Sequence, residues 1–206
     1  MGLKIYGIVR SRAFRTLWMA QELGIPYEQV QTDFSDGPMS CRAPSFATIN
    51  PNAQIPAIDD DGFKLWESLA INLYLAKKHA DKGFYPKSLQ DEAKCWQWAL
   101  WGATGVEGPI GIWGQHTIMF PPEKRDSKQA EEALRKLAGP FKVLDAHLKG
   151  NSYLVGNSFG VADLNLAGIM SRALVMDFSA TPAVGDWLRR CLERPAAKAV
   201  RKLRDG

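Results

Sequence analysis

The hydrophobic pattern of this 206-residue chain changes once, near residue 80, from alternating strand and helix signals to helical signals alone. Such a chain is expected to fold as an α/β part followed by an all-α part, because the spacing of apolar residues differs between strands and helices. We therefore expect an α+β domain over residues 1–80, a linker rich in Lys, Gly, Pro and Ser over 81–90, and an all-helical domain over 91–206.

The first eighty residues carry strand and helix signals in the order βαβ and then ββα. Two strands are expected at residues 3–8 and 26–30, and the helix between them begins near Ser11, whose side chain can cap it. The next elements are expected to be strands at residues 55–59 and 63–66 and a helix from Ser68. The Asp-Gly pair between these strands favours a hairpin, because glycine adopts the positive φ that the turn needs. This order predicts a small mixed sheet with helices packed on it.

Beyond residue 90 the sequence shows helical periodicity and no strand signal. Between residues 123 and 148 the apolar residues recur at steps of four and three, as one buried stripe of a helix requires. Further helices are expected over residues 92–118, 161–176, 182–192 and 195–203. This part of the chain is therefore predicted to be a helical bundle.

Composition and charge argue against several classes of protein. No apolar run reaches the roughly 20 residues that a membrane span needs, and the N-terminus lacks the features of a secretory signal, so a cytoplasmic location is expected. The three cysteines lie far apart without a Cys/His cluster, which indicates neither a disulfide framework nor a metal site. Much of the net charge of +4 lies near the C-terminus, but that segment has no interleaved aromatic residues. We therefore expect no nucleic-acid binding and a modest attraction for small anions.

Four sequence patches, in order and at compatible spacing, resemble the cytosolic glutathione transferase family. They are residues 4–24, which end in Glu-Leu-Gly, residues 50–58, similar to the family's Asn-Pro-x-Gly-Lys-Val-Pro, residues 62–75, and residues 159–164. The resemblance covers nearly the whole chain. It implies a thioredoxin-like first domain that binds glutathione as co-substrate and a helical domain that lines the site of a second substrate. It also implies a homodimer and no metal ion.

The fourth patch departs from the family pattern at Gly160, where Ser or Thr is usual as a helix cap. Glycine is tolerated at a cap position with a small loss of stability. Asp163 is therefore still expected to hold the turn at the start of its helix.

The resemblance assigns the glutathione-binding residues one by one. A cis Pro56 would turn the backbone N–H and C=O of Ile55 toward the cysteine moiety of glutathione. At the γ-glutamyl end, Ser68 would bind the carboxylate and Glu67 the ammonium. Gln54, where lysine is common, would bind the glycyl carboxylate by a hydrogen bond alone. Two other interpretations stay open, because Ser68 also suits a plain N-cap and Pro56 also suits the first residue of an edge strand.

Ser11 is the expected catalytic residue, because it lies where serine-type transferases carry the hydroxyl that hydrogen-bonds the glutathione sulfur. A thiol with a pKa of about 8.5 is mostly protonated at neutral pH, and one donor plus a helix N-terminus can stabilise the thiolate. Tyr6 occupies the position of the hydroxyl in tyrosine-type transferases, although it could equally face the core. Arg12, beside Ser11, could also stabilise a thiolate or could simply be exposed.

The second-substrate pocket is expected between Ser11 and the first helices of the bundle, with apolar walls that suit an apolar electrophile. The candidate lining residues are Phe14, Trp101, Trp113, Met119 and Phe120. Aromatic residues on helices are more often core residues, so about two of these five are expected to line the pocket.

The leading hypothesis is an enzyme that conjugates the thiolate of glutathione to an apolar electrophile. The alternatives are a non-catalytic binding or scaffold protein of the same fold, and a glutathione-dependent peroxidase or dehalogenase that uses the same thiolate. Glu67 and Ser68 beside Pro56, together with a hydroxyl at Ser11, favour glutathione binding, because a scaffold would not need them.

Overall fold

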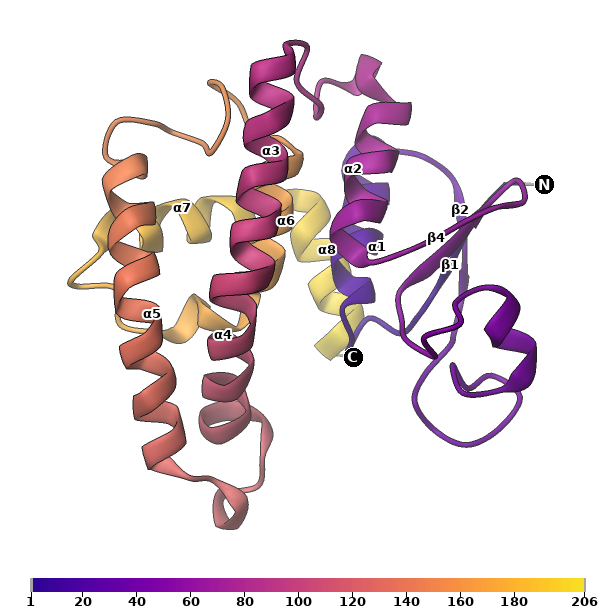
Figure 1. Cartoon of the computed structure of the whole chain (residues 1–206), viewed down its shortest axis with the longest axis horizontal. Coiled ribbons are helices and arrows are strands. Elements are labelled where there is room, and N and C mark those ends of the chain that lie inside the picture. Colours follow the sequence, from indigo (N-terminus) through magenta and orange to yellow (C-terminus); the bar gives the residue numbers. More distant parts are fainter. Residues whose placement is uncertain (1, 206) are drawn as a thin grey trace. The chain divides into compact units, whose positions relative to one another are not determined.

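The computed structural model describes residues 2–205, and for residues 204 and 205 it describes the backbone alone. Contacts between residues divide the chain into two units, Met1–Tyr85 with Arg194–Gly206, and Pro86–Glu193 (Figure 1). The expected linker at residues 81–90 stays a prediction.

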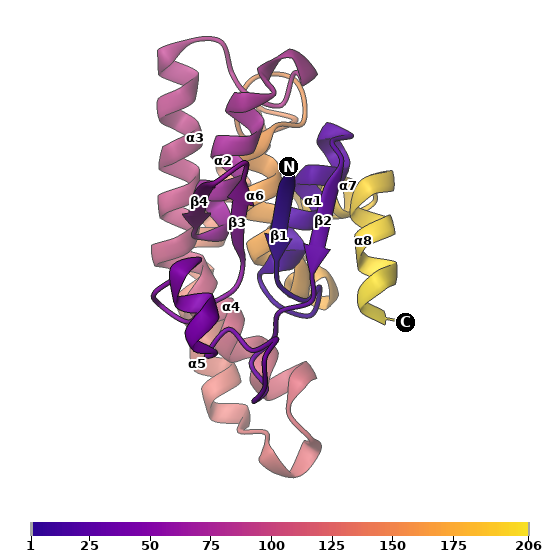
Figure 2. The same cartoon turned by 90° about the vertical axis from the view of Figure 1, so that its right-hand side faces the viewer.

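The first unit is built on a four-stranded mixed sheet with the strand order β2-β1-β3-β4 (Figure 2). β1 pairs in parallel with β2 and antiparallel with β3, which in turn pairs antiparallel with β4. The elements are β1 Leu3–Tyr6, α1 Ala13–Leu23, β2 Tyr27–Val30, β3 Ala57–Asp60, β4 Phe63–Trp66 and α2 Ser68–Lys78, with a short 3₁₀ helix at Pro44–Thr48 between β2 and β3. This is the βαβ-ββα order of a thioredoxin-like domain, so the predicted fold class of this part is confirmed.

The last helix, α8 (Pro195–Asp205), packs on α1 and belongs to the first unit. Just before it, Arg194 donates from Nε and Nη2 to the two carboxylate oxygens of Glu22, each at 2.7 Å. The Glu22 side chain is only 5% exposed, and its Oε1 also accepts from Trp18 Nε1 at 2.9 Å. A two-pronged ion pair of this kind is strong and directional. One of the basic residues near the C-terminus therefore has a structural partner on α1.

The second unit is helical, as predicted. Its α-helices are α3 Leu89–Trp101, α4 Glu107–Gly114, α5 Ser127–Leu148, α6 Val161–Ile169 and α7 Pro182–Leu192. The helix expected over residues 92–118 contains two π-helical stretches, Gly102–Val106 and Gln115–Met119, which periodicity does not reveal. At Gly102 a Cβ atom would lie 2.9 Å from methyl groups of Leu166 and Ile169, so a larger residue here would require these side chains on α6 to shift.

Asp163 holds the turn at the start of α6, as predicted. It is fully buried and accepts hydrogen bonds from the backbone N–H of Leu154 at 2.9 Å, the N–H of Gly160 at 3.2 Å and Trp187 Nε1 at 2.8 Å. Gly160 has no side chain, so the capping bonds here come from the aspartate alone. Burial raises the pKa of Asp163, although these N–H donors favour its ionised form.

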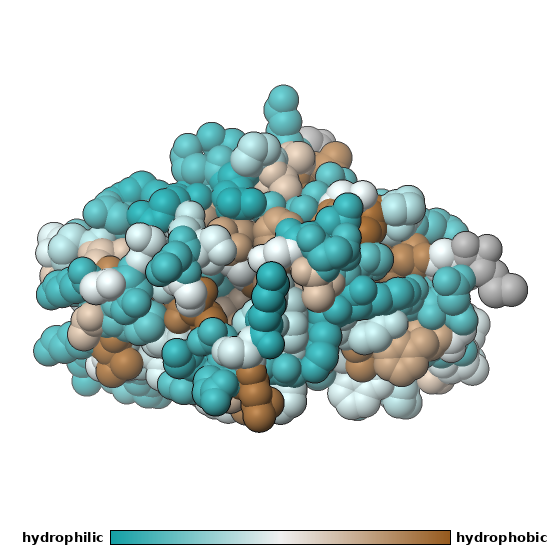
Figure 3. Space-filling model, turned by 90° about the horizontal axis from the view of Figure 1, so that it is seen from above, coloured by the Kyte–Doolittle hydropathy of each residue, from teal (hydrophilic) through white to brown (hydrophobic). Residues whose placement is uncertain are grey.

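The face seen in Figure 3 is mainly hydrophilic, with small hydrophobic areas between polar side chains. Within residues 2–205, no helix combines the length and the apolar character that a membrane crossing requires. The described residues also contain no group of three or more His, Cys, Asp or Glu side chains suited to a metal ion. All three cysteines are buried and outside any disulfide, and burial raises the pKa of Cys95 to about 12, which makes that thiol unreactive.

Candidate functional site

The loop before β3 has the conformation that the sequence predicts. The Ile55–Pro56 peptide bond is cis. Asn50, which is 2% exposed, donates from Nδ2 to the carbonyl oxygen of Gln54 at 2.8 Å and so ties the loop together. Pairing between β1 and β3 begins at Tyr6 and Ala57, so the backbone of Ile55 lies just beyond the paired residues. The Ile55 side chain is buried, whereas Gln54 is exposed.

Glu67 and Ser68 form the junction between β4 and α2. Glu67 has φ +73° and ψ 108°, a region that residues other than glycine rarely adopt and that costs about 1–3 kcal/mol. Its side chain is exposed, and its carbonyl oxygen accepts the N–H of Ile71 at 2.9 Å. Ser68 is the first residue of α2 and is 4% exposed, and no side chain caps this helix. The junction therefore places a serine hydroxyl at an uncapped helix N-terminus, where an anion is favoured.

Arg15 also contacts this junction, and our sequence analysis missed it. Its side chain is 6% exposed, and Nη1 donates to Ser68 Oγ at 3.2 Å. The signal was present in α1, because Arg15 precedes the buried Trp18 and Met19 by three and four residues and so lies on the apolar stripe. A charged side chain on a buried helix face is stable only where it has a polar partner, and Ser68 is such a partner.

Ser11 lies two residues before α1, and the N-cap residue of this helix is Arg12 and not Ser11 as expected, although the Ser11 side chain still bonds the first N–H of the helix. Its Oγ accepts the N–H of Ala13 at 3.1 Å and donates to the carbonyl oxygen of Ile8 at 2.7 Å. Nearby, Gly7 has φ +144°, and a Cβ atom there would lie 2.6 Å from Ala13 Cβ and 3.4 Å from Ile55 Cβ. Gly7 thus lies between the start of α1 and the cis-proline loop, and its lack of a side chain allows both segments to come close.

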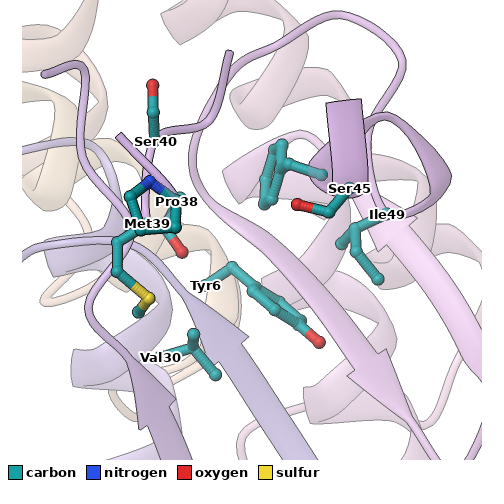
Figure 4. A pocket seen from close by; sticks show the side chains of 9 residues that line it. Tyr6, Val30, Pro38, Met39, Ser40, Ser45 and Ile49 are labelled. Carbon is teal, nitrogen blue, oxygen red and sulfur yellow. The ribbon is translucent and has the colours of Figure 1, made fainter. Parts of the chain in front are cut away.

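Tyr6 lies in a different environment from Ser11. Its ring packs edge-on against Phe46, with 5.8 Å between the ring centroids, and it lines a pocket beneath the segment between β2 and β3 (Figure 4). The other lining residues are Val30, Thr32, Pro38, Met39, Ser40, Ser45, Phe46 and Ile49. Burial and the nearby carboxylate of Asp59 raise the pKa of Tyr6, so its hydroxyl stays protonated. Arg12, the other alternative to Ser11, is exposed and directly precedes α1.

The five candidates for the second-substrate pocket fall into two groups. Phe14 is 4% exposed and Trp113 is 8% exposed. Phe14 packs on Trp18 in the first unit, and Trp113 belongs to an apolar cluster with Ala130 and Ala133 in the second unit. The remaining three are Trp101 and Phe120, which are partly exposed, and Met119, which is 51% exposed. Two of the five candidates are therefore core residues of their own units.

The sequence matches two family models. The one described as "Glutathione S-transferase, N-terminal domain" matches residues 1–77, and the one described as "Glutathione S-transferase, C-terminal domain" matches residues 113–195. The chain is 31% identical to "Probable glutathione S-transferase GSTF2" of Oryza sativa subsp. japonica, an alignment that covers 98% of this chain and 96% of the relative. It is also 30% identical to "Elongation factor 1-gamma 2" of the same organism, over 94% of this chain and 47% of that protein.

The backbone resembles solved structures over nearly its whole length. One is the theta class glutathione S-transferase of the citrus canker pathogen Xanthomonas axonopodis pv. citri, solved with glutathione bound. It has a TM-score of 0.86 and 26% identity, and the match covers 96% of each chain.

Proposed function

This chain belongs to the glutathione S-transferase family, and on that basis we propose that it transfers the thiolate of glutathione to an electrophilic carbon of an apolar substrate. The observation that carries the proposal is the convergence at Gly7, where the segment that bears Ser11 meets the loop that bears Ile55 and Pro56. A hydroxyl donor and a backbone that can hold a cysteine moiety then lie in one unit of the chain. The proposal includes a cytoplasmic location, which rests on the family alone.

The tripeptide would be held at three points. The backbone of Ile55 would pair with the cysteine moiety, and exposed Gln54 would reach the glycyl carboxylate. At the other end, Ser68 would donate to the γ-glutamyl carboxylate at the start of α2, and the exposed Glu67 would accept from the ammonium. The strained φ of Glu67 supports this role, because unusual backbone conformations persist where function requires them.

Once glutathione is bound, the reaction requires little from the protein beyond stabilisation of the sulfur anion. The thiol loses its proton to solvent, and the sulfur anion attacks the electrophilic carbon to form the C–S bond while a leaving group departs or the neighbouring atom takes up a proton. Ser11 would donate its O–H to the anion and so lower the pKa of the thiol. To do so it must turn away from the carbonyl oxygen of Ile8, which accepts that hydrogen at 2.7 Å in the free protein. A hydrogen bond to an anion is stronger than one to a neutral carbonyl, which favours the exchange.

The direct test is the ultraviolet absorbance of bound glutathione thiolate, followed across pH with the wild-type protein. We expect the thiol to ionise about one to two pH units below its ordinary value of about 8.5, since a charge-assisted hydrogen bond contributes about 1.5–3 kcal/mol. Glutathione that binds but titrates as in water would refute the transferase mechanism. The similarity to an elongation factor subunit would then favour the non-catalytic alternative, a binding or scaffold protein.

An apolar second substrate fits the surface of the second unit. Ile112 on α4 and Ile118 and Met119 in the following π-helical stretch are 37%, 45% and 51% exposed. These side chains offer a hydrophobic contact to an electrophile of low polarity. Trp101 at the end of α3 is partly exposed as well.

The proposal also includes a homodimer. Helix α3 carries an exposed apolar stripe whose residues follow one another at steps of four, three and four. They are Leu89, Ala93, Trp96 and Leu100. Leu89, Trp96 and Leu100 are 75%, 52% and 66% exposed, which is unusual for large apolar side chains on one helix face. A second copy of the chain is the partner that family membership favours.

Trp96→Glu should therefore shift the protein from dimer to monomer. Loss of a central aromatic anchor typically costs 2 kcal/mol or more, so we expect the dimer dissociation constant to rise by about thirtyfold or more in sedimentation equilibrium. Val143→Glu, on an exposed position of α5, provides the matched control and should leave it unchanged. Equal dimer dissociation constants for the two variants would argue against the α3 stripe as the interface.

A further inference from the structure

The first helix buries a guanidinium that the proposed mechanism does not use. Arg15 is 6% exposed, and its Nη1 lies 3.2 Å from Ser68 Oγ. Its backbone carbonyl oxygen accepts from Nδ2 of the fully buried Asn72 at 3.3 Å, so α1 and α2 are tied together at this place. The side chain of Arg15 thus lies against the first turn of α2, in contact with the hydroxyl proposed to bind a carboxylate.

This contact determines how Ser68 can act as a donor. A serine hydroxyl has one hydrogen to donate and two lone pairs to accept with, whereas a guanidinium can only donate. Ser68 therefore accepts from Arg15 and keeps its own hydrogen for a different acceptor. Within residues 2–205 the structure shows no acceptor for that hydrogen. The hydroxyl is held ready to donate to a ligand that approaches the helix N-terminus.

The charge of Arg15 acts in the same direction. Helix α2 begins at Ser68 without a side-chain cap, and the dipole of the helix makes this end partly positive. A buried guanidinium in contact with the serine carries a positive charge that little water screens. A carboxylate at this point would meet a hydroxyl donor, a helix N-terminus and a buried cation together.

We infer that Arg15 is a positioning residue for the γ-glutamyl α-carboxylate of glutathione, which it serves by orienting the Ser68 hydroxyl and by adding a positive charge in contact with it. The inference rests on the proposed function, which assigns that carboxylate to Ser68. The proposal gives Arg15 no role at the sulfur, so its loss should weaken glutathione binding and leave the ionisation of the bound thiol unchanged.

The test compares three ligands by calorimetry on the full chain. They are glutathione, 4-aminobutyryl-Cys-Gly, which lacks the α-carboxylate, and glutaryl-Cys-Gly, which lacks the α-ammonium. Arg15→Met should weaken binding of glutathione and of glutaryl-Cys-Gly by about tenfold to a hundredfold, as expected for a lost charge-assisted contact. It should leave 4-aminobutyryl-Cys-Gly within about twofold of the wild type. Bound glutathione should still ionise at the wild-type pH.

Matched variants separate positioning from general damage. Glu67→Gln should show the opposite ligand pattern and weaken the two ligands that carry the ammonium. Lys64→Met, which removes an exposed cation on β4, controls for long-range charge and should change none of the three affinities. If Arg15→Met does not fold, Arg15→Lys, which keeps the charge, and Arg15→Gln, which keeps N–H donors, carry the test and should each recover part of the selectivity for the α-carboxylate.

Several outcomes would overturn the inference, and they differ from those that would overturn the proposed function. An equal loss for all three ligands in the Arg15 variants would mean that Arg15 is only structural. Additive effects of Arg15→Met and Ser68→Ala in a double-mutant cycle would mean that Arg15 does not act through Ser68. If the wild-type protein binds glutathione and 4-aminobutyryl-Cys-Gly equally well, or binds neither, the assignment of Ser68 fails and the inference fails with it.

Discussion

Replacing Ser11 by alanine should lower kcat/KM for glutathione addition by about a hundredfold to a thousandfold, because the sulfur anion loses its only proposed side-chain donor. The KM for glutathione should change little, since Ile55, Glu67 and Ser68 remain in place. The bound thiol should then ionise near its ordinary value of about 8.5. Steady-state kinetics and the thiolate absorbance of the same variant check the two expectations.

The variant also removes a hydrogen bond at the start of α1, and this effect on stability has to be separated from the effect on catalysis. Ser11 Oγ accepts the N–H of Ala13 at 3.1 Å, so its loss should lower the free energy of unfolding by about 1 kcal/mol. Ser11→Thr keeps both this hydrogen bond and the donor and should retain most of the activity. A Thr variant as inactive as the Ala variant would point to packing at this position and not to the hydroxyl.

Two further variants decide between Ser11 and its alternatives. Tyr6→Phe should stay within about twofold of the wild-type kcat/KM, because the Tyr6 ring packs on Phe46 in a pocket that Ser11 does not line. Arg12→Met should likewise have a small effect, since Arg12 is exposed. A collapse of activity in Tyr6→Phe with an active Ser11→Ala would transfer the catalytic role to Tyr6.

Replacing Asp163 by alanine should reduce the free energy of unfolding by about 4 kcal/mol, a large loss for one substitution. The aspartate is fully buried and accepts from three N–H groups, those of Leu154, Gly160 and the Trp187 indole. Alanine would leave all three donors without this acceptor, and the N–H groups of Leu154 and Trp187 are buried. Urea unfolding followed by tryptophan fluorescence measures the loss, and Trp187 itself reports on the site.

Asp177→Ala is the matched control for this prediction. The Asp177 carboxylate also accepts from a backbone N–H, that of Ser179 at 2.8 Å, but Asp177 is exposed and water can replace it. Its loss should therefore cost about 1 kcal/mol or less. A similar cost for the two variants would show that burial of this aspartate is not what makes Asp163 important.

The fold was largely predictable because the signals that specify it are local. Period-two and helical patterns placed the four strands and the helices that flank them, and the Asp-Gly pair marked the turn between β3 and β4. Two features escaped this reasoning. The helix over residues 92–118 is interrupted by π-helical stretches, and α8 packs with the first unit through Arg194 and Glu22, which are 172 residues apart. No local pattern reports a contact over that distance.

The candidate site was likewise predictable in its local motifs and not in its long-range contacts. The motifs around Ser11, Pro56 and Glu67-Ser68 could be read from the sequence, and the cis bond before Pro56 was predicted correctly. The contact between Arg15 and Ser68 spans 53 residues and arises only when α1 and α2 pack together. The sequence also left the environment of Tyr6 undecided. That environment depends on the segment between β2 and β3, which brings Phe46 against the Tyr6 ring.

By itself, then, the sequence determined the kind and order of the elements, the cis-proline turn and the identity of the short motifs. The elements depend on backbone preferences and side-chain periods that act over a few residues, and the cis proline and the motifs follow from the resemblance of short segments to one family. Only the tertiary structure decided which polar groups are buried together, as at Arg15 with Ser68, Glu22 with Arg194, and Asp163 with Trp187. Burial is a property of packed elements, and a buried polar group is stable only where packing supplies its partner.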